Sequence, residues 1–224
     1  RTISKGGAVT GCGNGTRGIQ AGADNGSNDA TIDYVTIAST GNSIDFGDLT
    51  IARGDAGGGE NDTRAVFMAG SGALEIDYVT MATTGNATDF GDCAISVSNR
   101  GGTGGGGRAM VIGGSATYNT MEYVTVATIG NATDFGDLTS AQEYSGGLSS
   151  GARGVRIGGA AQVTMDYVTI ATTGNATDFG DATQAKYGAT GVSNGTRGCF
   201  AGGAGNKQVI EKITIATTAN ATER

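Results

Sequence analysis

Arginines and aspartates are the residues of this chain whose type and spacing could do chemistry. An arginine in a Thr-Arg-Gly-like step recurs five times, at spacings of 47, 44, 45 and 44 residues. The five are Arg17, Arg64, Arg108, Arg153 and Arg197. A guanidinium recognises a carboxylate or another anion through a fork of two hydrogen bonds. The series therefore suggests either a ligand site for an anionic glycan or a carboxylate-bearing receptor, or a structural belt of ion pairs.

The aspartates recur in a second motif, Asp-Phe-Gly-Asp, which occupies residues 45–48, 89–92, 134–137 and 178–181. These carboxylates are the expected partners of the arginines, because a residue present in every repeat is most simply explained by packing between repeats. Two carboxylates three residues apart could also hold calcium, which prefers oxygen ligands, but they fall short of a dense calcium loop. Aspartates commonly cap turns instead. We expect no metal and no cofactor.

The side chains needed for most enzyme mechanisms are missing. The sequence has no histidine, which excludes Ser-His and Cys-His nucleophiles and the commonest general acid or base. It also has no phosphate-binding loop and no metal-hydrolase motif. Paired carboxylates could still hydrolyse glycosidic bonds, but nothing distinguishes one aspartate pair from its copies. The sequence predicts a protein that is not an enzyme.

Charge and hydropathy exclude two further classes of partner. The net charge is −7 and no cluster of lysine or arginine occurs, so we expect no nucleic acid partner. No stretch approaches the roughly 18 apolar residues of a membrane span, so we expect no membrane insertion. The three cysteines, Cys12, Cys93 and Cys199, follow no disulfide spacing and are expected to be free and mostly buried. Because the chain begins at Arg1, we expect it to be a processed product or part of a longer protein.

The elements that position these residues form a tandem repeat. A segment that reads Asp-Tyr-Val-Thr-Ile-Ala in its first copy, from Asp33, returns four times, and its last copy is divergent. The central threonines are spaced by 44, 45, 44 and 45 residues: Thr36, Thr80, Thr125, Thr169 and Thr214. Valine, isoleucine, tyrosine and threonine are good strand formers. The 43 glycines are expected to punctuate the chain between strands.

Each repeat contains about four short strands. A glycine-rich stretch leads into the arginine step, and an apolar run, the Tyr-Val-Thr-Ile strand and the Asp-Phe-Gly-Asp strand follow. Four strands in about 45 residues are typical of one propeller blade. We therefore predict an all-β fold: a single five-bladed β-propeller over residues 1–224, with four antiparallel strands per blade. An open solenoid is the alternative architecture. The predicted blades are residues 6–50, 51–94, 95–139, 140–183, and 184–224 together with 1–5.

The phase of the repeat at the two ends predicts how the ring closes. The last repeat stops where the others enter the Asp-Phe-Gly-Asp strand, and residues 1–5 match residues 49–53 at the end of that strand. We therefore expect the N-terminal segment to complete the fifth blade.

The repeat also resembles two known kinds of sequence. The arginine step, an apolar run ending in paired glycines and a tyrosine strand resemble the kelch-type repeat of galactose-oxidase-like propellers. The paired glycines are Gly113 with Gly114, Gly158 with Gly159, and Gly202 with Gly203. Kelch blades usually carry a tryptophan in the fourth strand, which this chain lacks. The residues expected in its place are Phe46, Phe90, Phe135 and Phe179.

The run Tyr-Val-Thr-Ile-Ala-Thr-Thr-Gly-Asn-Ala-Thr-Asp-Phe-Gly-Asp, at residues 167–181, is similar to tandem repeats of virion and tail-associated proteins of marine bacteriophages, cyanophages among them. This resemblance covers essentially the whole chain. It implies a virion component in a tail fibre, spike or surface appendage, with other virion proteins as partners. A secreted lectin-like propeller is the alternative, and sequence flanking the chain would discriminate the two.

The segments that differ between repeats are where specificity for host-surface glycans would lie, because binding modules keep specificity in loops. They are polar and mostly glycine-rich: residues 22–29, 60–62, 99–107, 142–150 and 206–208.

Overall fold

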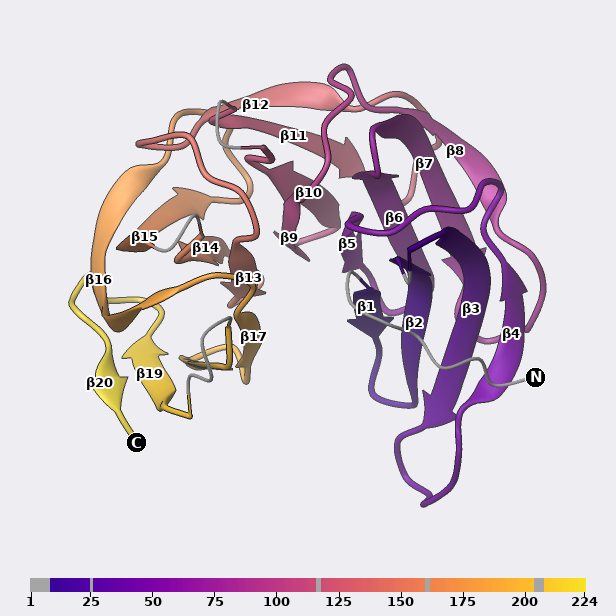
Figure 1. The fold of residues 1–224 in the computed structure, drawn as a ribbon, viewed down its shortest axis with the longest axis horizontal. Coiled ribbons are helices and arrows are strands. Elements are labelled where there is room, and N and C mark those ends of the chain that lie inside the picture. The colour runs from indigo at the N-terminus through magenta and orange to yellow at the C-terminus, as the bar shows by residue number, and fades with distance from the viewer. Residues whose placement is uncertain (1–8, 25, 116–117, 160–161, 204–207) are drawn as a thin grey trace.

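The computed structural model of the chain describes residues 9–24, 26–115, 118–159, 162–203 and 208–224, and these residues form an all-β fold. Their strands make five four-stranded antiparallel sheets that follow one another around a central channel (Figure 1). The predicted five-bladed β-propeller with four antiparallel strands per blade is therefore confirmed. No helix long and apolar enough to cross a membrane occurs in this described part of the chain.

Every blade uses its strands in chain order, from the channel outward. The first blade consists of β1 (Thr10–Gly13), β2 (Arg17–Asp24), β3 (Asn28–Thr36) and β4 (Ile44–Asp48). The second consists of β5 (Gly57–Glu60), β6 (Arg64–Gly70), β7 (Ala73–Thr80) and β8 (Thr88–Asp92). The third consists of β9 (Gly101–Gly105), β10 (Arg108–Ile112), β11 (Thr120–Thr125) and β12 (Thr133–Asp137). The fourth consists of β13 (Gly146–Ser149), β14 (Arg153–Ile157), β15 (Gln162–Thr169) and β16 (Thr177–Lys186). The fifth consists of β17 (Thr190–Ser193), β18 (Arg197–Ala201), β19 (Ile210–Thr214) and β20 (Thr222–Glu223).

One predicted blade boundary falls inside a strand. Strand β16 continues to Lys186, so the boundary placed at residue 183 cuts an intact strand. The fourth strand of the last blade is β20, in which Thr222 pairs with Lys212 and Glu223 with Glu211. The C-terminal residues themselves thus start that strand. Residues 1–5, predicted to complete it, lie outside the described residues.

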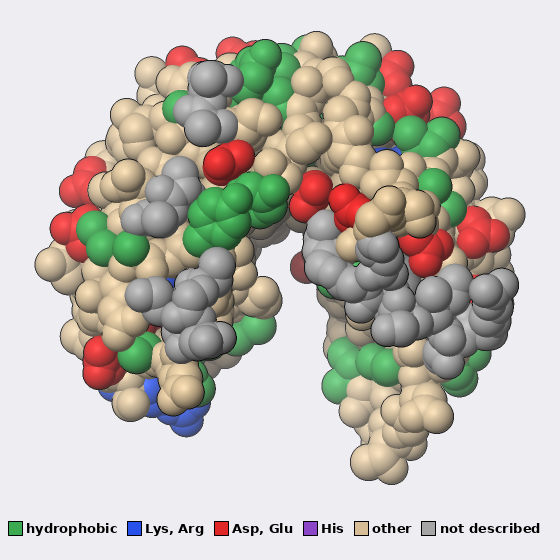
Figure 2. Space-filling model, in the orientation of Figure 1, with side chains coloured by type: hydrophobic (Ala, Val, Ile, Leu, Met, Phe, Trp, Pro, Cys, Tyr) green, Lys and Arg blue, Asp and Glu red, His purple; other side chains and the backbone are tan. Residues whose placement is uncertain are grey.

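Apolar clusters join each blade to the next one. Four clusters of buried residues connect blades one and two, two and three, three and four, and four and five. In the first of them, Ile19 and Phe46 of blade one pack with Phe67 and Met81 of blade two. Among the described residues no such cluster joins the fifth blade to the first, and the space-filling view shows an opening between them (Figure 2).

Many glycines lie inside the innermost strands, and the prediction that they only punctuate the chain is wrong. Strand β5 reads Gly-Gly-Gly-Glu and β9 reads Gly-Gly-Thr-Gly-Gly. A Cβ added at Gly59 would lie 2.8 Å from the Cα of Ala109, and one at Gly191 would lie 2.7 Å from the carbonyl oxygen of Gly147. Both clashes are with the neighbouring blade. At these glycines the inner strand lies so close to the neighbouring blade that a side chain has no room.

A second set of contacts ties the outer strand of each blade to the next blade. The Phe46 carbonyl accepts from Gly85 N–H at 2.7 Å, and the Asp48 carbonyl accepts from Ala87 N–H at 2.8 Å. The Asn86 side chain then accepts from Asp48 N–H at 3.1 Å. Equivalent asparagines act at the three other junctions: Asn131, Asn175 and Asn220. The Gly-Asn-Ala turns are therefore connectors between blades.

The glycine of the Asp-Phe-Gly-Asp motif gives a test of this connection. Gly91 has φ of +141°, and a Cβ there would lie 2.6 Å from the Gly130 carbonyl group of the next blade. Gly91→Ala should therefore destabilise the protein by roughly 1–3 kcal/mol through overpacking. Chemical denaturation measures the loss. Gly41→Ala is the control, because a Cβ there meets nothing within 4 Å; equal effects of the two substitutions would contradict the argument.

Candidate functional site

The five arginines singled out from the sequence begin the second strand of every blade. In the first four blades the guanidinium lies over the tyrosine ring of its own blade, 4.1–4.6 Å from the ring centroid. It also donates a hydrogen bond to a main-chain carbonyl of the next blade. These bonds join Arg17 to Met81 (2.7 Å), Arg64 to Val126 (3.1 Å), Arg108 to Ile170 (2.6 Å) and Arg153 to Ile215 (3.0 Å).

These contacts give the arginines a structural role, although not the predicted one. No ion pair between them and the Asp-Phe-Gly-Asp carboxylates is present among the described residues, so the predicted pairing is wrong. Arg197 differs from the other four. It is exposed, and Lys212 stands where the other blades have tyrosine. The structure thus brings four of the five residues into equivalent interfaces and leaves Arg197 apart.

A different set of cations forms the ion pairs. An acidic residue precedes the tyrosine of the third strand in blades two to four and Lys212 in blade five, and it is buried in each. The pairs are Arg53 with Asp77 (2.9 Å), Arg100 with Glu122 (2.5 Å), Arg156 with Asp166 (2.7 Å) and Lys186 with Glu211 (2.6 Å). Burial lowers the pKa of Arg156, and the Asp166 carboxylate acts in the opposite direction. Removal of one partner from such a pair leaves an uncompensated buried charge.

Sequence reasoning missed these pairs although half of the signal is present. The acids occupy one equivalent position in every repeat, from Asp33 onward. Their cations come from different kinds of element. Arg53 and Arg100 lie in segments between blades, Arg156 lies in the second strand β14, and Lys186 is the last residue of the outer strand β16. A search for one recurring pair therefore cannot find them.

The aspartates of the Asp-Phe-Gly-Asp motif accept local hydrogen bonds, and the cysteines are free. The first aspartate of the motif accepts a hydrogen bond from the glycine N–H two residues later, as between Asp89 and Gly91 at 3.0 Å. No group of three or more potential metal ligands occurs among the described residues. The cysteines are free, as predicted, and burial raises the pKa of Cys93 to about 12. A buried thiol that stays protonated is a poor nucleophile.

The best candidate for a binding site lies at one mouth of the central channel. A hollow of about 520 Å³ is lined there by eleven residues, which come from the ends of β2 and β17 and from the segments that lead into the five innermost strands: Val9, Asp24, Asp55, Ala56, Asn99, Arg100, Tyr144, Ser145, Gly188, Ala189 and Thr190. Acidic and hydrophobic side chains border this opening in Figure 2. The only basic residue of the lining, Arg100, is buried and paired with Glu122.

Three residues at equivalent positions of this mouth have an uncommon backbone conformation. Asp55, Asn99 and Tyr144 each stand two residues before an inner strand and have φ of +54°, +62° and +52°. A positive φ is costly for residues other than glycine and occurs often where strain serves a function. Blade five has Gly188 at the same position. One position of the repeat therefore places three different side chains around the channel mouth: a carboxylate, an amide and a phenol.

An aromatic pair completes this site. The Tyr144 and Tyr187 rings lie 4.4 Å apart between centroids with an interplanar angle of 31°. Burial and a hydrogen bond with Tyr187 raise the pKa of Tyr144 to about 12, so the phenol remains a neutral donor. Asn99 donates to the Glu143 carboxylate at 3.3 Å. The mouth therefore offers flat apolar rings together with hydrogen-bonding groups, which is the composition of many small-molecule sites.

Three of the five variable segments supply this mouth: residues 22–29 through Asp24, residues 99–107 through Asn99, and residues 142–150 through Tyr144. Glu60 of segment 60–62 lines the channel instead. That channel, of about 710 Å³, is walled mainly by glycines of the inner strands. Most of segment 206–208 lies outside the described residues. Comparison of the chain with protein-family models and with curated proteins finds no match.

The arginine contacts predict unequal effects of two identical substitutions. Arg153→Ala removes the stacking on Tyr167 and the bond to Ile215, and should cost about 2 kcal/mol. In thermal unfolding this is a fall in Tm of roughly 4–8 °C. Arg197→Ala removes neither contact and should change stability by less than about 0.5 kcal/mol. Comparable losses would show that the contacts contribute nothing.

The pKa of Asp55 predicts a pH dependence of stability. Burial, and then repulsion from Asp24, raise the pKa of this carboxyl in the folded protein. The folded protein therefore loses stability as pH rises from the ordinary aspartate pKa of about 3.9 through the raised value. Asp55→Asn removes this loss, so its gain in Tm should be larger at neutral pH than at pH about 3. The exposed Asp62→Asn is the control; a gain independent of pH would contradict the prediction.

Proposed function

We propose that this chain is a non-enzymatic component of a bacteriophage virion, in a tail fibre, spike or surface appendage, and that its propeller binds host-surface glycan at the channel mouth. The observation that carries the binding role is the ring of Asp55, Asn99 and Tyr144 around the hollow, beside the Tyr144–Tyr187 pair. The virion location rests on the resemblance of the repeat to marine bacteriophage sequences. Other virion proteins are the expected partners.

The chemistry of the mouth suits a sugar ring. A pyranose has an apolar face that packs on an aromatic ring and hydroxyl groups that need hydrogen-bond partners. Tyr144 offers the ring, while Asp55 and Asn99 offer acceptors and a donor. The site suits a neutral glycan better than an anionic one, because Asp24 and Asp55 are carboxylates and Arg100 already neutralises Glu122. This departs from the sequence-based idea that the five arginines bind an anionic glycan.

A secreted lectin-like propeller is the second candidate function, and the same mouth would serve it. The two differ in where the protein is found. Peptides of the chain in purified phage particles support the virion role, whereas peptides confined to culture supernatant support the secreted one.

A glycan array tests the binding role. The chain is expected to bind a restricted set of neutral glycans, and Tyr144→Ala and Asp55→Asn should each weaken the binding at least about tenfold, the value of one lost hydrogen bond or stacking contact. Asp62→Asn, outside the mouth lining, should bind as the unmodified chain does. Two results would contradict the proposed binding site: the folded chain binds no glycan, or all three variants bind glycan equally well. The protein would then be a structural scaffold.

A further inference from the structure

The two sides of a blade are chemically different. The leading face of a blade packs against the preceding blade, and in blade two it is formed by Ala65, Phe67, Val79 and Met81. The trailing face packs against the following blade, and in blade one it includes Ile19, Ala21, Ile32 and Phe46. The four junctions thus repeat one kind of contact between a trailing and a leading face.

The leading face of the first blade is uncovered. Val35 and Ile37, at the positions of Val79 and Met81, are 40% and 57% exposed. Val79 and Met81 are 3% and 0% exposed. The equivalent residues of blades three to five are also buried: Val124, Val126, Val168, Ile170, Ile213 and Ile215. Blade one therefore exposes the apolar residues that four other blades bury.

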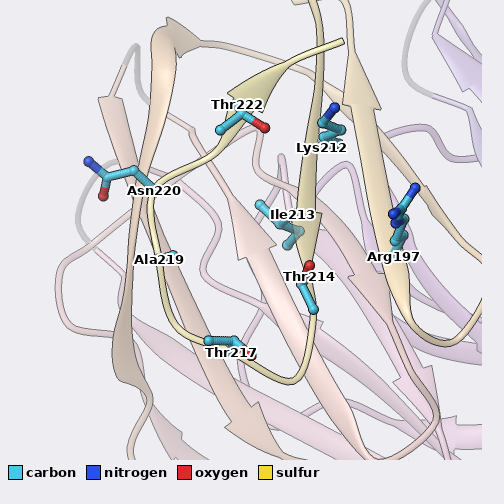
Figure 3. Close-up of a pocket in the computed structure, with 8 residues that line it drawn as sticks. All are labelled: Arg197, Lys212, Ile213, Thr214, Thr217, Ala219, Asn220 and Thr222. Atoms are coloured by element: carbon cyan, nitrogen blue, oxygen red, sulfur yellow. The ribbon is translucent and has the colours of Figure 1, made fainter.

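The trailing face of the fifth blade is uncovered in the same way. Val192 is 64% exposed and Ile210 is 46% exposed, whereas Leu148 and Met165 at these positions of blade four are 5% and 0% exposed. A hollow of about 320 Å³ opens on this blade, and Arg197 and Lys212 border it from neighbouring strands (Figure 3). Both faces thus keep apolar residues at positions that other blades bury, although Gln20 stands at the position of Phe67 and Lys212 at the position of Tyr78.

A polar contact is available at the same place. Four arginines donate to the carbonyl of the residue equivalent to Met81 in the next blade. In the described part of the chain the Arg197 guanidinium has no such acceptor, and the equivalent carbonyl of blade one belongs to the exposed Ile37. The trailing face of blade five and the leading face of blade one therefore match in both apolar and hydrogen-bonding character.

We infer that the trailing face of blade five binds the leading face of blade one in a second copy of this chain. Each copy carries both faces, so the contact is head-to-tail. The described blades already surround most of the channel (Figure 2). The second copy therefore does not close a flat ring, and repeated head-to-tail contacts produce an open helical assembly.

Two charged variants test this contact. Ile37→Asp blocks the leading face of blade one, and Val192→Asp blocks the trailing face of blade five; both side chains are exposed, so both variants should fold. In light scattering, the average molar mass of the unmodified protein should rise with its concentration. Each variant alone should stay monomeric. In an equimolar mixture, Ile37→Asp supplies an intact trailing face and Val192→Asp supplies an intact leading face. The mixture should therefore form a dimer, with twice the mass of one chain, and nothing larger. Ile129→Asp, on the outer rim of blade three, should assemble like the unmodified chain.

Cys199 gives an independent readout, because it lies on the trailing face of blade five and is only partly buried, whereas Cys12 and Cys93 are buried. Its reaction with a thiol reagent should slow several-fold as the concentration of unmodified chain rises, but stay constant in Val192→Asp. Three results would overturn the inference: a monomeric unmodified chain with constant Cys199 reactivity, a mixture that remains monomeric, or assembly that survives both charged substitutions. If the unmodified chain is monomeric, the next variant carries one further blade of the repeat after residue 224. Protection of Cys199 in that variant would show that an added blade, and not a second copy, covers the trailing face of blade five.

Discussion

The close approach of the innermost strands around the channel is the constraint on which the rest of this structure depends. Neighbouring β5 and β9 lie so near each other that a Cβ at Gly57 or Gly102 would overlap atoms of the adjoining blade. Glycine loses more conformational freedom on folding than any other residue, so a strand made of it is intrinsically weak. The inner strands are stable because the second strand of the same blade and the neighbouring blades hold them. This explains why a chain with 43 glycines folds into an ordered sheet protein.

The contacts between blades farther from the channel compensate for the weakness of the glycine-rich inner strands. Away from the channel, each junction gains an apolar cluster, an arginine stacked on tyrosine and bound to a neighbouring carbonyl, and an asparagine bound to a neighbouring N–H. Four of the blades add a buried ion pair. A buried pair contributes little net stability over an apolar one, but it penalises any arrangement that separates the charges. These pairs therefore favour one register of the sheets over others.

The sequence predicted the architecture well because the architecture is periodic. The spacing of Thr36 and its copies and the recurrence of Arg17 were sufficient for the number of blades and the strands within each. Interpretations that relied on residue type alone were less successful. Residue type predicts glycines between strands, although in β9 they are required by crowding. It also predicts that Arg153 binds an anionic ligand or a motif carboxylate, although Arg153 contacts Tyr167 and a main-chain carbonyl.

The channel mouth could not be predicted for the opposite reason. Asp55, Asn99 and Tyr144 share a position and a backbone conformation but no side-chain chemistry, so a search for similar residues passes over them. Their proximity follows from the circular arrangement, which brings equivalent positions of distant repeats to one rim. The contribution of residues 1–5 to the last blade lies outside the described residues and stays a prediction.

The acceptor that each stacked arginine uses has a consequence for how such a protein can evolve. Because Arg17 and its equivalents bind a main-chain oxygen, the residue that provides it can be Met81, Val126, Ile170 or Ile215 without loss of the bond. A blade therefore places few demands on the exact sequence of its neighbour. Unequal recombination between repeats in the gene can exchange, duplicate or remove whole blades while every junction keeps its hydrogen bond. Diversity in the rim residues can then accumulate by shuffling blades as well as by point mutation.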